Sequence, residues 1–211
     1  MLSTNTIFYI VVLIMSVVVH EAAHGFAADH EGDPTARRAG RLTLNPLKHL
    51  DPVGSVLVPI LLIVMHAGFV IGWAKPVPYF ENNFRDKRRG TRLVASAGIL
   101  VNIGIAVIFG LLIRFVSPAF GMYQAPFVSI STVIVMVNLL LAAFNLIPVP
   151  PLDGSKILFS FIPESMPGIR RKIEYFALPL LLLFTLFLWP LVVPAVGFVF
   201  SVLTGHAAPF L

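Results

Sequence analysis

Residues 7–28 read IFYIVVLIMSVVVHEAAHGFAA, an apolar run that carries His20, Glu21 and His24 in its second half. A helix of this length spans roughly 33 Å, about the thickness of the hydrocarbon core of a bilayer. Ionisable side chains are costly in hydrocarbon, and those that occur there mark functional sites by default. This stretch therefore predicts a membrane-spanning helix with a functional site built into it.

The spacing of these three residues is that of an H-E-x-x-H motif. On a helix, His20 and His24 are separated by about 40° around the axis and about 6 Å along it, so both imidazoles can reach one ion. Glu21 is offset by about 100°, which suits a general base that faces a water beside that ion. An accidental match is expected in roughly one chain in a hundred of this length.

The rest of the chain has the composition of a membrane protein. It is 57% hydrophobic and only 12% charged, with a mean hydropathy of +0.90. Further apolar runs occupy residues 54–72, 93–116, 126–147 and 176–203. We predict an all-α polytopic membrane protein, residues 1–211 as a single domain, with about four to six membrane-embedded helices and short β or extended loops. The last run, interrupted by Pro190 and Pro194, fits either one kinked helix or a tight hairpin.

The 15 Lys and Arg residues predict the topology. If residues 54–72 cross the membrane, these charges divide ten to five, whereas a re-entrant segment leaves fourteen on one side. The positive-inside rule favours the re-entrant alternative, with the N-terminus outside and the basic loops in the cytoplasm. No recognition motif accompanies the positive charge, so we expect it to face lipid headgroups and not nucleic acid.

The chain has no cysteine, so a zinc site must use imidazole and carboxylate ligands. A catalytic zinc takes three protein ligands and keeps one position open. Asp153 is the candidate for the third, because the proline-rich residues 148–151 end the preceding helix and leave carbonyls unpaired beside it. Gly154 then permits a close backbone approach. The alternative for an Asp-Gly pair is an ordinary turn.

Taken together, two motifs resemble the site-2 protease family of intramembrane zinc metalloproteases. They are His20–His24 and the segment NLIPVPPLDG at residues 145–154. The segments GRLTLNP at 40–46, DPVG at 51–54 and GWAKPVP at 72–78 resemble the compact bacterial branch without PDZ or CBS domains. The resemblance extends over roughly residues 7–160.

This resemblance implies one zinc per chain bound by His20, His24 and Asp153, with Glu21 as the catalytic base. It implies hydrolysis of peptide bonds in or near the transmembrane segments of membrane-protein substrates. The expected location is the bacterial cytoplasmic (inner) membrane, with the active site toward the cytoplasm. The substrate and the oligomeric state are not indicated.

Three further polar residues lie within apolar runs. Asn102 and Asn145 either donate hydrogen bonds to a transition state or substrate, or link helices. The family pattern before Asn102 has a proline where this chain has Ile99. His66 either lines a water path near the site or is a neutral, hydrogen-bonded residue of the bundle.

A non-catalytic membrane zinc-binding protein, transporter-like or a pseudoprotease, is the alternative function. A transporter does not need Glu21 as a base and usually shows repeat symmetry, which this sequence lacks. The intact Glu21 argues against a pseudoprotease.

Overall fold

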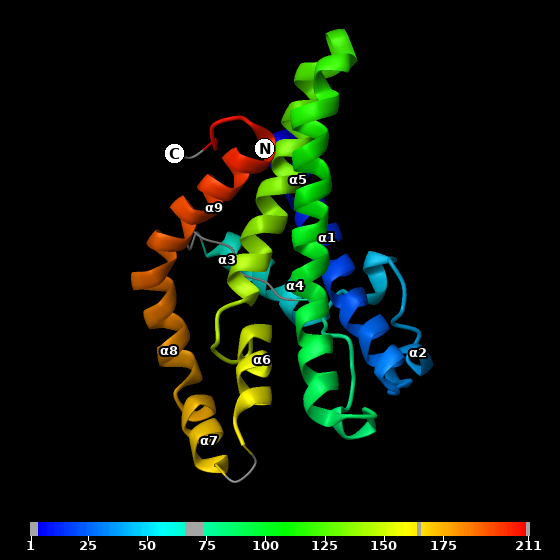
Figure 1. Ribbon diagram of the computed structural model, residues 1–211, viewed down its shortest axis with the longest axis vertical. Coiled ribbons are helices and arrows are strands. Elements are labelled where there is room, and N and C mark those ends of the chain that lie inside the picture. The colour runs from blue at the N-terminus through cyan, green and yellow to red at the C-terminus, as the bar shows by residue number, and fades with distance from the viewer. Residues whose placement is uncertain (1–3, 66–73, 164–165, 210–211) are drawn as a thin grey trace.

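The computed structural model describes residues 4–65, 74–163 and 166–209, and every regular element in these ranges is a helix (Figure 1). The prediction of an all-α fold is therefore confirmed. The proline-rich stretch 74–80 forms neither helix nor strand.

Along the chain the helical elements are α1 (Thr4–Glu31), α2 (Thr35–Arg38), η1 (Pro46–Lys48), η2 (Pro52–Leu57), α3 (Val58–Val64), η3 (Glu81–Asn83), α4 (Lys87–Leu111), η4 (Leu112–Val116), η5 (Ser117–Tyr123), α5 (Gln124–Asn145), α6 (Asp153–Phe161), α7 (Pro167–Tyr175), α8 (Ala177–Leu183), η6 (Phe184–Leu188) and α9 (Trp189–Thr204). The symbol η denotes 3₁₀ turns (η1, η3, η5) and π turns (η2, η4, η6).

In the described part of the chain, three helical stretches are long and apolar enough to cross a membrane: Ile7–Glu31, Lys87–Asn145 and Ala177–Thr204. The second, of 59 residues, holds both α4 and α5. These two helices run side by side in opposite directions (Figure 1). The chain reverses between them at Gly121, whose φ of 53° lies in the left-handed region. The protein is therefore an integral membrane protein with several spans.

The last apolar run forms a single bent path of α8, η6 and α9, which continues in one general direction (Figure 1). The bend coincides with the π turn of η6 and with Pro190 and Pro194 in α9. Both features are common causes of helix kinks. Of the two alternatives for residues 176–203, the structure therefore shows the kinked helix.

The two loops on either side of the 54–72 run are hydrogen-bonded to each other. The backbone N–H of Lys75 donates to the carbonyl of His49 at 2.9 Å, and that of Arg85 donates to Glu31 at 2.9 Å. Lys75, which follows the apolar run, therefore lies next to His49, which precedes it. The two ends of the run at 54–72 are thus close to each other. Residues 66–72 of that run, His66 included, lie outside the described residues.

The helices pack around a core shared by α4, α5 and α9. Its buried members include Ala106, Val135 and Phe200. A polar contact joins α1 to α5, where the Asn138 amide donates to the Ser16 hydroxyl at 2.9 Å. Hydrogen bonds of this kind hold helices together in a bilayer, where no hydrophobic force acts between them.

Candidate metal centre

α1 and α6 bring three buried side chains to one point. The Nε2 atoms of His20 and His24 lie 3.0 Å apart, and each lies 3.0 Å from Oδ2 of Asp153. The three residues form a buried group whose donor atoms could hold one metal ion. The sequence separates Asp153 from the two histidines by more than a hundred residues, and the fold brings them together.

The hydrogen bond of His24 shows that this group suits a cation. Its Nδ1 lies 2.7 Å from the carbonyl oxygen of Val94, which can only accept, so Nδ1 carries the proton. A neutral His24 then presents a bare Nε2 lone pair to the carboxylate of Asp153, which is also an acceptor. The lone pairs of His24 Nε2 and Asp153 Oδ2 thus face each other at 3.0 Å, and a positive charge between them would stabilise this arrangement. Tetrahedral zinc ligands lie roughly 3.3 Å apart, close to the spacing observed in this group. The donor set therefore fits zinc.

Two glycines make the assembly possible. A Cβ atom added at Gly98 of α4 would lie 2.5 Å from Cε1 of His20. One added at Gly154 would lie 2.2 Å from the carbonyl oxygen of Leu146. Both distances are too short for any side chain, so these close approaches require glycine. The prediction that Gly154 permits a close backbone approach is confirmed.

Lys156 is a neighbour of the group that the sequence patterns did not single out. Its Nζ lies 3.0 Å from Oδ1 of Asp153, the carboxylate oxygen that faces away from the histidines. Burial alone would raise the pKa of Asp153, but a hydrogen bond from His20 and the charge of Lys156 hold it well below its ordinary value. The i, i+3 spacing from Asp153 at the start of α6 was the available signal.

Glu21 is held by the backbone of a distant segment. Its Oε2 accepts a hydrogen bond of 2.8 Å from the N–H of Val77. The guanidinium of Arg41 in turn donates to the carbonyls of Lys75 and Pro76, at 2.7 and 3.3 Å, and to that of Lys48. No local pattern in the sequence indicated that residues 75–77 would reach Glu21.

The other sequence candidates are placed differently. Asn102 lies one turn beyond Gly98 on α4, fully buried, and neither of its amide atoms has a hydrogen-bond partner among the described residues. Asn145 donates to the carbonyl of Leu141 in its own helix at 3.0 Å. Neither residue contacts the three clustered side chains through a hydrogen bond in the described part of the chain. His66 lies outside the described residues.

Comparison with known proteins places this geometry in context. Residues 118–188 match the model of "Peptidase family M50". The chain is 39% identical over 170 residues to "Putative zinc metalloprotease YwhC" of Bacillus subtilis (strain 168), a match that covers 78% of this chain and 72% of the relative. It is 32% identical over 142 residues to "Putative zinc metalloprotease Rip2" of Mycolicibacterium smegmatis, covering 67% of this chain and 52% of the relative. A third relative, "Putative zinc metalloprotease MJ0611" of Methanocaldococcus jannaschii, is 31% identical over 105 residues, half of each chain. No solved structure gave a significant match.

A buried His-His-Asp group whose two histidines lie on a helix long enough to span a membrane, together with these relatives, defines a membrane zinc metalloprotease. The chain belongs to peptidase family M50, the site-2 proteases. The resemblance seen in the two sequence motifs is thereby confirmed.

Proposed function

We propose that this protein is an intramembrane endopeptidase that hydrolyses peptide bonds in or near the transmembrane segments of membrane-protein substrates. One zinc ion per chain is held by His20, His24 and Asp153. The observation that carries the proposal is the convergence of these three donor atoms, each 3.0 Å from the other two, with both histidines on a helix long enough to span a bilayer.

Zinc at this position supplies a Lewis acid that activates water and polarises a carbonyl group. The protein's own groups then handle the protons. The Glu21 carboxylate takes a proton from the attacking water and delivers it to the departing amine. The Val77 N–H, 2.8 Å from Oε2, orients this carboxylate, and the Val94 carbonyl fixes the tautomer of His24.

The proposed orientation has the basic loops, and with them the metal centre, toward the cytoplasm of a bacterial inner membrane. Loops 29–52 and 74–86 and the start of α4 together carry ten Lys and Arg residues. The two loops are hydrogen-bonded to each other, so these charges lie on the same side of the membrane. By the positive-inside rule, loops rich in Lys and Arg remain on the cytoplasmic side of the membrane.

The variant Glu21→Gln separates catalysis from metal binding. We expect it to lower the rate of cleavage of a reconstituted transmembrane substrate at least about 100-fold, because the base is removed. Zinc content should stay at the wild-type level, since the three donor side chains are unchanged. Atomic absorption on the purified protein measures the metal.

The variant Asp153→Ala tests the metal site. Because it removes one of the three zinc ligands, the purified variant should retain less zinc than the wild type. Full activity of Glu21→Gln would refute the proposed base. Unchanged zinc in Asp153→Ala would remove Asp153 from the metal site. A wild-type protein that binds zinc but cleaves no membrane-protein substrate would favour the non-catalytic alternative.

A further inference from the structure

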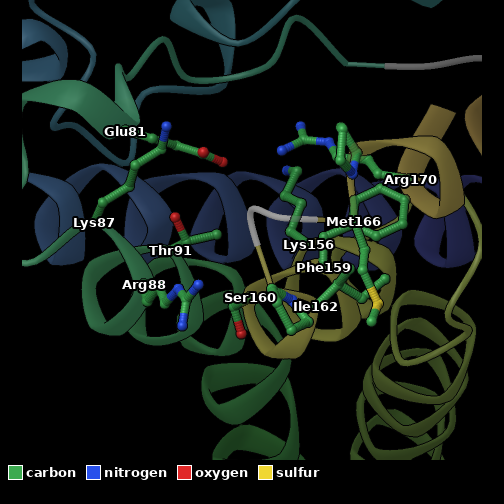
Figure 2. Close-up of a pocket in the computed structure, with 12 residues that line it drawn as sticks. Glu81, Lys87, Arg88, Thr91, Lys156, Phe159, Ser160, Ile162, Met166 and Arg170 are labelled. Carbon is green, nitrogen blue, oxygen red and sulfur yellow. The ribbon is translucent and has the colours of Figure 1, made fainter.

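A cavity lies beside the metal centre, at the end of the molecule where α4 begins. Its volume is about 220 Å³, and it is lined by residues of η3, the first turns of α4, α6 and the start of α7. Figure 2 shows side chains from these elements facing the same space from opposite sides. None of the proposed catalytic steps uses this cavity.

The lining is strongly basic. Lys87 and Arg88 enter from α4, and Lys156 and Arg170 from α6 and α7, whereas Glu81 is the one carboxylate among the described lining residues (Figure 2). Lys156 is paired with Asp153 at 3.0 Å and Arg170 with Glu174 at 2.8 Å, whereas Lys87 and Arg88 form no ion pair with any acidic side chain in the described part of the chain. Cations that converge without sufficient counter-charge make a site for an anion.

The same cavity has an apolar part. Phe159, Ile162 and Met166 line it beside the cations. A small inorganic anion gains nothing from such side chains, because its whole surface is polar. An amphiphile with an anionic group and a hydrocarbon portion would contact both kinds of residue.

The position of the cavity suits a lipid. Lys87 lies six residues before Leu93, where the apolar part of α4 begins, so it stands about 9 Å beyond the start of that apolar part. The headgroup region on each side of a bilayer is roughly 5–8 Å thick. The basic side chains therefore lie at the outer edge of the headgroup region, and basic pockets between membrane helices bind anionic headgroups in other proteins.

We infer that this cavity binds the headgroup phosphate of an anionic phospholipid. Lys87 and Arg88 supply the unpaired positive charge for the phosphate, Lys156 and Arg170 lie on the other side of it, and the apolar side chains receive the glycerol and the first acyl carbons. The bound lipid would share Lys156 with the metal centre, since its Nζ also lies 3.0 Å from Asp153 Oδ1. The inference concerns binding and holds whether or not the protein cleaves peptides.

The test is retention of lipid by the full chain in detergent, measured by native mass spectrometry with equal amounts of phosphatidylglycerol and phosphatidylcholine. The wild type should retain phosphatidylglycerol roughly tenfold better, as expected for a few lysines and arginines near a lipid surface. Lys87→Gln/Arg88→Gln should lose this preference. Both residues are exposed, so the fold should tolerate the change.

Arg171→Gln/Lys172→Gln is the matched control, because it removes the same charge from exposed positions of α7 that do not line the cavity. It should stay within about twofold of the wild type. An equal loss in both variants would show a general surface-charge effect and overturn the proposal, as would a wild type without preference. Displacement of phosphatidylglycerol by excess inorganic phosphate would assign the site to free phosphate instead. Retention of the lipid in that excess supports a lipid site.

Discussion

The imidazole of His20 occupies space that is open only because residue 98 has no side chain. A Cβ atom there would lie 2.5 Å from Cε1 and 2.6 Å from Nε2 of His20. Gly98→Ala should therefore displace the imidazole. Metal sites tolerate displacements of only about 0.5 Å, so we expect the zinc-to-protein ratio after a chelator challenge to fall at least about twofold. Atomic absorption measures the ratio.

Gly104→Ala is the matched control for this prediction, since it lies on the same helix and its added Cβ would meet no atom within 4 Å. Zinc content should not change in this variant, and helix stability should rise by up to about 1 kcal/mol. Equal zinc in both variants would mean that His20 can move without affecting the metal.

The sequence predicts the role of a residue when that role depends on a short pattern of neighbouring residues, and not when it depends on a contact with a distant segment. The helical spacing of His20 and His24 and the broken backbone before Asp153 are local patterns, and the structure brings those three side chains together. The N–H of Val77 that meets Glu21 is a backbone group, present in almost every residue, so composition and spacing carry no sign of it. The sequence left two roles for Asn145, a contact with the substrate or transition state and a link between helices. In the structure its amide donates to the Leu141 carbonyl of its own helix.

At the level of elements, Asp33 joins the end of α1 to the segment before α4. It is fully buried and accepts hydrogen bonds from Thr35, from the N–H of Phe80 at 2.6 Å and from the Asn83 amide at 2.8 Å. Hydrogen bonds to a charged group contribute about 1.5–3 kcal/mol each. We expect Asp33→Asn to lower the thermal midpoint in detergent by several degrees, whereas Asp86→Asn, an exposed helix cap, should change it little.

The stabilisation by Asp33 should depend on pH. Burial acts to raise its pKa, but the hydrogen bonds from Thr35, Asn83 and Phe80 outweigh burial and hold the pKa below its ordinary value of 3.8. A lowered folded-state pKa means that the stabilisation is complete above the ordinary value and is lost as the pH falls through the folded-state pKa. The difference in midpoint between wild type and Asp33→Asn should thus shrink in acid. A constant difference would contradict this assignment.

Arg41 connects another pair of segments and bears on Glu21. It is buried, and its guanidinium holds the carbonyls of Lys75 and Pro76, directly before the residue that hydrogen-bonds Glu21. Arg41→Gln should release this segment and lower the cleavage rate roughly tenfold, the effect of about 1.4 kcal/mol, with zinc content unchanged. Arg38→Gln, an exposed neighbour, is the control. A wild-type rate in Arg41→Gln would show that Glu21 needs no support from residues 75–77.

Hydropathy predicted the long helices because burial in lipid imposes apolar runs of fixed length. Their ends were harder to predict. The apolar run of α4 begins at Leu93, yet the helix begins at Lys87, because the Asp86 carboxylate caps it by accepting from the N–H of Arg89 at 2.9 Å. Capping of this kind extends a helix into polar sequence. Whether residues 176–203 formed one helix or two depended on packing, which the sequence did not contain.

The topology of the whole molecule can be tested because the natural chain has no cysteine. Single variants Arg38→Cys, Arg85→Cys and Met122→Cys place a thiol at exposed positions in the first loop, the second loop and the turn between α4 and α5. The hydrogen bonds between the loops place the first two thiols on one side of the membrane, and the α4 span places the third on the other. The positive-inside rule assigns the first two to the cytoplasm. An impermeant maleimide should therefore label Met122→Cys in intact spheroplasts, and Arg38→Cys and Arg85→Cys only in inverted vesicles. Opposite labelling of Arg38→Cys and Arg85→Cys would mean that residues 54–72 cross the membrane, and the proposed cytoplasmic position of the metal centre would then have to be abandoned.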